Sequence, residues 1–141
     1  MTTQSVIRSS SSSSSNLLRR ALLGNCIFSM LSGLFFLLAA NPITSFLGLD
    51  LPMVISVTGI NLLLFAAIVY KVATASPINR TLALIIVALD VAWVVGSIML
   101  IFANMVPLTT AGKWAIAIVA DIVTLFAIAQ YIGIRRMGKR A

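Results

Sequence analysis

Four long apolar runs, each broken by at most one charged residue, constrain this chain more than any other feature. They cover residues 21–40, 51–70, 81–103 and 114–134. A helix of about 20 residues spans the roughly 30 Å hydrocarbon core of a bilayer. Water is absent there, so backbone groups must pair within each segment, and none of the runs shows the alternation of a membrane barrel strand. The sequence therefore predicts four transmembrane helices.

The connectors between the runs predict how these helices are arranged. All three span about ten residues or fewer, so sequential helices should pack antiparallel against each other, as an up-down-up-down four-helix bundle over residues 21–134. Asn41-Pro42 is expected to end the first helix, because proline disfavours helical geometry at the residue before it. Pro52 suits the first turn of the second helix. The fold class is all-α, integral membrane, with no second domain.

Charge sets the expected orientation. Only 9% of residues are charged, against about a quarter in soluble domains. Nine of the ten basic residues fall on one side of the predicted bundle, and only Lys113 falls on the other; the nine are Arg8, Arg19, Arg20, Lys71, Arg80, Arg135, Arg136, Lys139 and Arg140. Basic residues favour the cytoplasmic side. We expect a multi-pass protein of the cell (inner) membrane with both termini inside.

The two ends of the chain are expected to lie outside the bundle. Residues 1–20 contain seven consecutive serines and no acid, which predicts a disordered cytoplasmic segment, because such a tract buries too little apolar surface to order itself. It also has the composition of an organellar transit peptide, which is the alternative location. Residues 135–141 form a basic cytoplasmic tail. The first apolar run exceeds the length of an ordinary signal peptide core, so we expect it to stay uncleaved.

Composition also narrows the chemistry. The chain has no histidine and a single cysteine, Cys26, which leaves no histidine-based catalysis, CxxC redox pair or cysteine metal site. We expect no enzyme activity, no metal and no cofactor. The net charge of +7 is expected to meet anionic lipid head groups rather than nucleic acid.

Three polar residues near the middle of their runs are the candidate proton or cation site: Asn61, Asp90 and Asp121. A carboxylate at the bilayer centre costs roughly 2.5 to 3.5 kcal/mol on insertion scales, so both acids are expected to point into the bundle. No lysine or arginine lies inside the runs to pair with them. Two interpretations stay open. The acids bind a proton or cation and couple it to a solute, or they are hydrogen-bonded links that set helix register.

A second polar group follows the first helix. Asn25, Ser29, Ser32 and Gly33 share one helical stripe, which predicts a helix-packing seam, because small residues let helices approach and polar ones bond across the contact. A solute path along the same stripe is the alternative. Trp93, three residues after Asp90, either covers the Asp90 site or fills core volume.

Short segments of the chain resemble those of small uncharacterised bacterial inner-membrane proteins of four helices. The resemblance lies in Arg19-Arg20-Ala-Leu-Leu-Gly-Asn25, Leu31-Ser-Gly33-Leu, Ala88-Leu-Asp90-Val-Ala-Trp93 and Gln130-Tyr131-Ile-Gly-Ile-Arg135-Arg136. It implies four helices and no particular activity. The chain also resembles small multidrug exporters in size, but it lacks the glutamate that they carry in the first helix.

Two functions are compatible with these observations. The first is a non-enzymatic accessory or scaffold protein that associates with itself or with a larger membrane complex, because the short connectors leave little soluble surface. The second is a small proton- or cation-coupled transporter or channel that uses Asp90 and Asp121, as a homo-oligomer, because four helices enclose little space.

Overall fold

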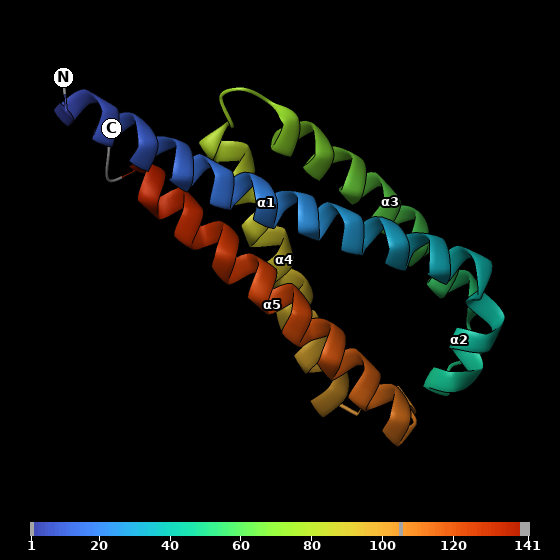
Figure 1. The fold of residues 1–141 in the computed structure, drawn as a ribbon. Coiled ribbons are helices and arrows are strands. Elements are labelled where there is room, and N and C mark those ends of the chain that lie inside the picture. The colour runs from blue at the N-terminus through green and yellow to red at the C-terminus, as the bar shows by residue number, and fades with distance from the viewer. Residues whose placement is uncertain (1, 105, 139–141) are drawn as a thin grey trace.

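The chain forms an all-α bundle in which four helices are long and apolar enough to cross a membrane. The computed structural model describes the backbone of residues 2–104 and 106–138, and the side-chain surroundings of residues 16–104 and 106–137. Its helices are α1 (Thr2–Leu38), α2 (Ala40–Leu47), α3 (Pro52–Thr74), α4 (Arg80–Phe102) and α5 (Thr110–Gly138) (Figure 1). The candidate spans are Asn16–Leu38, Pro52–Thr74, Arg80–Phe102 and Thr110–Met137. The prediction of a four-span membrane bundle is confirmed.

The helix ends differ from the predicted ones in two places. Helix α1 begins at Thr2, so the serine tract expected to be disordered continues the first helix, because extending a helix costs less than nucleating one. Asn41 and Pro42 lie in the first turn of α2, where a proline is tolerated, rather than in an open turn. Pro52 begins α3 as expected. Lys139 and Arg140 of the predicted basic tail lie outside the described residues.

The helices pack in the order α3, α1, α5, α4 rather than in chain order. Helix α1 packs against both α3 and α5, and α4 packs against α5. Consecutive helices α3 and α4 barely meet, although only five residues connect them. Figure 1 shows these two helices close together at their connector and diverging toward the opposite end. Sequential packing of all four helices, expected from the short connectors, is therefore wrong for this pair.

The hydrophobic core lies at the end of the bundle where the membrane span of α1 begins and that of α5 finishes. Leu18 and Leu22 of α1, Val69 of α3, Ile86 of α4 and Ile134 of α5 meet there, all almost fully buried. Ile78 from the α3–α4 connector joins the same cluster. Arg19 donates a hydrogen bond to the Ala75 carbonyl oxygen at 3.0 Å and so ties this connector to α1. These contacts close one end of the bundle.

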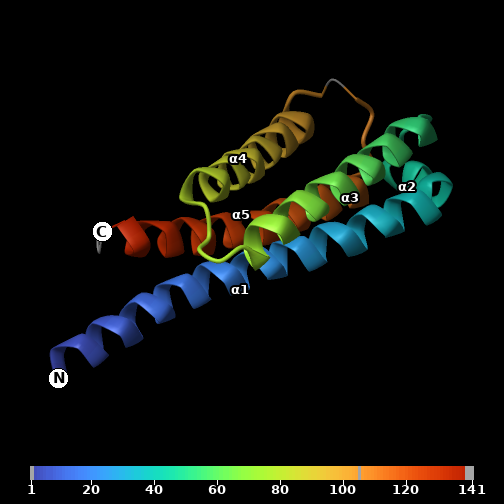
Figure 2. The ribbon, with the colours of Figure 1, turned by 90° about the horizontal axis from the view of Figure 1, so that it is seen from above.

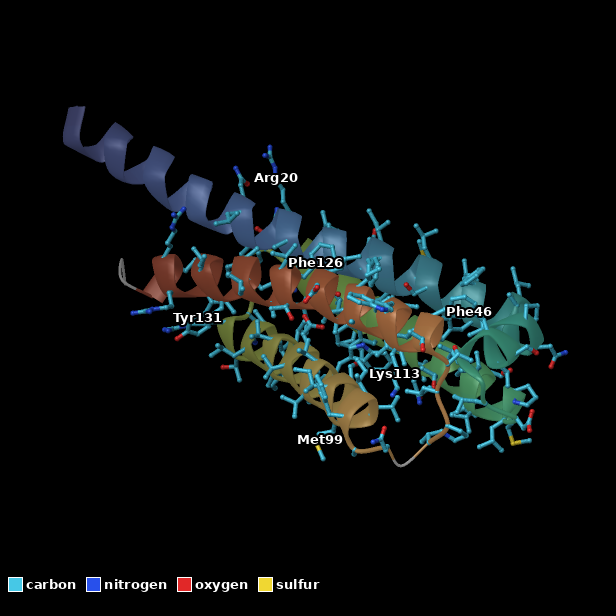
Figure 3. The ribbon with its side chains drawn as sticks, turned by 90° about the horizontal axis from the view of Figure 1, so that it is seen from below. Arg20, Phe46, Met99, Lys113, Phe126 and Tyr131 are labelled. Carbon is cyan, nitrogen blue, oxygen red and sulfur yellow. The ribbon has the colours of Figure 1, made fainter. Side chains whose placement is uncertain are left out.

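Helix α2 joins the helices at the opposite end. The Thr109 hydroxyl donates to the Phe46 carbonyl oxygen at 2.6 Å, and the Thr109 amide donates to the Leu47 carbonyl oxygen at 3.0 Å. The segment before α5 is thereby fastened to α2. In Figure 3, Phe46 and Lys113 lie toward this end, while Arg20 and Tyr131 lie nearer the end that holds the core.

Two glycines set the closest helix contact. A Cβ atom at Gly33 of α1 would lie 2.8 Å from the Gly59 carbonyl oxygen of α3, and a Cβ atom at Gly59 would lie equally close to the Gly33 carbonyl oxygen. Only glycine allows the two backbones to approach this far. Gly33 therefore occupies a helix-packing contact, as the sequence predicts.

This contact predicts that Gly33→Ala and Gly59→Ala each destabilise the protein by about 1 to 3 kcal/mol, the usual cost of overpacking. The native Cys26 thiol, which is buried against α3, reports unfolding when a thiol-reactive dye gains access to it on heating. Gly96→Ala is the matched control, because a Cβ atom at Gly96 meets open space. Equal melting temperatures for all three variants would contradict the tight crossing.

Candidate functional site

Asp90 is a buried carboxylate that joins three helices. It lies on α4 and is 4% exposed, on the stripe that also carries Ala83, Ile86 and Ser97, the other buried residues of that helix. Its Oδ2 atom accepts a hydrogen bond from Asn25 Nδ2 of α1 at 2.7 Å and a second from Gln130 Nε2 of α5 at 3.2 Å. No salt bridge to Asp90 is formed by the part of the chain that the structure describes. Two neutral amides therefore hold the carboxylate in place.

The two amides are held differently. Asn25 is fixed, because its own Oδ1 accepts a hydrogen bond from the Ser29 hydroxyl at 3.3 Å. Gln130 is fully buried, and its Oε1 atom has no hydrogen-bond partner among the described residues. Rotating the Gln130 amide by half a turn would therefore break no other hydrogen bond of its side chain. It would present an acceptor to Asp90 instead of a donor.

A cavity of about 290 Å³ lies beside this carboxylate between the four long helices. Its polar lining residues are Asn25, Ser29, Ser32, Thr58, Asn61 and Asp90, and its aromatic ones are Phe28, Phe36, Phe65 and Trp93. Leu62, Leu89, Val119 and Val123 complete the wall. Asp90 is the single ionisable residue among them. Both hydrogen bonds reach its Oδ2 atom, and none of the described residues donates one to its Oδ1 atom.

The cavity opens between α3 and α4. The residues that these two helices contribute to the wall include Asn61, Leu89 and Trp93, which are all exposed. In contrast, Asn25 and Ser29 of α1 are buried. Figure 2 shows α4 set apart from α3 along most of its length. The core cluster closes the bundle at the other side of the carboxylate, and the exposed residues of the wall lie on α3 and α4.

The structure separates the predicted site residues. Asp90 and Asn61 line the same cavity, but Asp121 does not. Asp121 is exposed on α5, and none of the described residues forms a hydrogen bond or salt bridge with it. The expectation that both acids point into the bundle is therefore wrong for Asp121. The reason is rotation: α5 turns Ala120, Val123, Ala127 and Gln130 inward, and Asp121 lies on the opposite face.

The predicted seam on α1 is also divided. Gly33 lies in the contact with α3, whereas Asn25, Ser29 and Ser32 line the cavity. Trp93 lines the cavity with Asp90 and is 39% exposed. Sequence reasoning missed Gln130 as a partner of Asp90. Its signal was an amide side chain inside an apolar run, where a polar group requires a partner.

The interhelical bond between Asn25 and Asp90 predicts energetic coupling. We expect a double-mutant cycle of Asn25→Ala and Asp90→Ala, measured by denaturant unfolding in micelles, to give a coupling energy of about 0.6 to 1.7 kcal/mol. Pairing Asp90→Ala with Thr124→Ala is the control, because among the described residues the Thr124 hydroxyl bonds only to the Ala120 carbonyl oxygen of its own helix. Coupling no larger than that of the control would contradict the bond.

Comparison with family models, with curated proteins and with solved structures finds no match to this chain. Its class therefore rests on the sequence and the fold. Four long apolar helices, packed as a bundle, identify an integral membrane protein with four spans.

Proposed function

We propose that this protein binds a small organic cation inside the membrane and exchanges it for a proton at Asp90. The observation that carries the proposal is the placement of one carboxylate, held by two amides, in the wall of an aromatic-lined cavity. A carboxylate attracts a cation strongly where the dielectric constant is low. Aromatic faces add cation–π attraction of about 0.5 to 2 kcal/mol each. A small cationic amine fits this combination.

The size and composition of the cavity favour an organic cation over a bare metal ion. Its volume of about 290 Å³ is near the lower limit of small-molecule pockets. A hard metal ion prefers a shell of several oxygen ligands. Here one carboxylate and a few hydroxyl and amide groups share the wall with four aromatic rings. A cation with an apolar surface can use both kinds of wall.

Gln130 supports the exchange with a proton. When Asp90 is ionised, Gln130 donates to it as observed. When Asp90 is protonated, the rotated amide can accept the new O–H, because Gln130 Oε1 has no other partner among the described residues. Asn25 donates to Asp90 in both states. Each charge state of the carboxyl can thus be satisfied, and a cation and a proton compete for the same oxygen atoms.

Benzyltrimethylammonium is a suitable probe, because its charge does not change with pH. We expect it to change the fluorescence of Trp93 in a Trp114→Phe background, which leaves Trp93 as the single tryptophan. Asp90→Asn should weaken binding at least tenfold, about 1.4 kcal/mol, because the amide keeps the shape of the side chain but loses its charge. Asp121→Asn, outside the cavity, should change the affinity less than twofold.

The uncharged isostere neopentylbenzene is the control ligand. Equal affinities for the two compounds would show that the cavity selects apolar shape and not charge. Unchanged benzyltrimethylammonium binding in the Asp90→Asn variant would contradict the proposal directly.

Proton exchange predicts a definite pH dependence. Protonation removes the negative charge of Asp90, the single ionisable residue of the cavity wall, so the affinity for benzyltrimethylammonium should fall as the pH is lowered. In the Asp90→Asn variant the affinity should not change with pH. In proteoliposomes with an acidic lumen, the wild type should accumulate the probe, while Asp90→Asn should not. Binding without accumulation would indicate a receptor instead of a transporter.

The accessory or scaffold function is the second candidate, and Asp121 favours it. Asp121 lies outside the cavity, on the outer face of α5. There it gives this face a polar group with which another membrane helix can associate. Neither candidate is an enzyme, and neither uses a metal or cofactor.

For the orientation, we propose that the closed end of the bundle faces the cytoplasm across the inner membrane. Arg19, Arg20, Arg80 and Arg135 lie at this end of the candidate membrane spans, while Lys113 lies near the start of the last span at the other end. Basic residues flanking a membrane helix favour the cytoplasmic side and anionic lipid head groups.

A further inference from the structure

We propose that the outer face of α5 is the interface of a symmetric homodimer, in which Asp121 of one copy hydrogen-bonds to Asp121 of the other. This interface is independent of the Asp90 cavity and of the function proposed for it.

The starting observation is the position of Asp121. It lies close to the middle of the apolar run of α5 and is exposed, on the face opposite the buried residues of that helix. Around it lies a stripe of large apolar residues at helical spacing, all of them 40–68% exposed: Trp114, Ile118, Leu125, Ile128 and Ile132. A single copy would therefore present a carboxyl group to hydrocarbon, which is one of the most costly arrangements in a membrane protein.

Asp121 lacks the hydrogen-bond partners that Asp90 has within the described part of the chain. Asp90 receives two amide donors from neighbouring helices, whereas no described residue gives Asp121 a hydrogen bond or an opposite charge. The described basic residues lie near the ends of the spans, far along their helices from the depth of Asp121. A partner for this side chain must come from outside the bundle.

A second copy of the chain can supply this partner, because it carries the same carboxyl group at Asp121. A carboxyl group in its neutral form carries one donor and at least one acceptor. Two such groups are complementary to each other. In copies that share the orientation proposed above, a two-fold axis along the membrane normal brings the same residue of each copy to the same depth. The flanking stripe has the alternating spacing of four and three residues that packs helices at about +20°.

An unpaired carboxyl group distinguishes this face of α5 from the outward face of α4. Helix α4 is also broadly exposed, with Val91, Val95 and Met99 among its outward residues. Its one carboxylate, Asp90, is buried and already paired. Apolar side chains on α4 are equally satisfied by lipid tails, so nothing there favours a protein neighbour over lipid. A single polar position in an apolar seam instead fixes the register of the pair.

The test uses disulfide cross-linking in lipid vesicles, with Cys26→Ala removing the native thiol. Leu125→Cys, next to Asp121 on the proposed interface, should cross-link efficiently, while Val95→Cys on α4 should not. Asp121→Asn should retain cross-linking at Leu125→Cys, because an amide also pairs with itself. Asp121→Leu should reduce the association constant about tenfold, measured by energy transfer between labelled copies over a series of lipid dilutions.

Far-UV circular dichroism and benzyltrimethylammonium binding check that each variant is folded. A monomer at every protein density would overturn the proposal, as would association that Asp121→Leu leaves unchanged, or cross-linking through Val95→Cys in place of Leu125→Cys. Because Asp121→Leu leaves the cavity intact, loss of the dimer with retained binding distinguishes this interface from the function proposed for Asp90.

Discussion

The hydrogen bonds to Asp90 are the interaction on which the arrangement of this bundle depends. Helices α1 and α4 lie on opposite sides of α5 in the packing order, and the bond from Asn25 to Asp90 joins them across the centre. The bond from Gln130 adds α5 to the same point. In a bilayer there is little hydrophobic force between helices, because lipid tails are as apolar as the side chains. Polar bonds and close backbone contacts must then determine which helices meet.

Polar hydrogen bonds and close packing contacts stabilise different parts of the bundle. The glycine pair of α1 and α3 draws those helices together, and the core cluster closes the end that carries most of the basic residues. Between these contacts, α4 is held to the centre mainly through α5 and the Asp90 bonds. The space left between α3 and α4 becomes the cavity. The cavity is thus a consequence of the weak direct contact between α3 and α4.

Much of this fold could be predicted from the sequence, because hydropathy and length decide the number of spans directly. The positions of Asp90 and Gly33 also followed from simple rules: an intramembrane acid turns inward, and a glycine on a polar stripe marks a helix contact. What could not be predicted was helix rotation and neighbour choice. Exposing a carboxylate to lipid is as costly for Asp121 as for Asp90. However, α5 packs through Ala120, Val123 and Gln130, and this leaves Asp121 on the outer face. Short connectors suggested that α3 and α4 are neighbours, yet a connector limits only the distance between two helix ends.

The opening between α3 and α4 also determines how a ligand can reach Asp90. The core cluster, with Ile78 of the connector, blocks the end of the bundle that carries the basic residues. Exposed cavity residues lie instead on the lipid-facing side, where Trp93 and Asn61 stand at the opening. An organic cation with an apolar surface concentrates at the membrane interface, so it can approach such an opening from within the bilayer. A small inorganic ion does not enter lipid, and for it this route is closed. The direction of the opening therefore favours the same class of ligand as the aromatic wall does, on independent physical grounds.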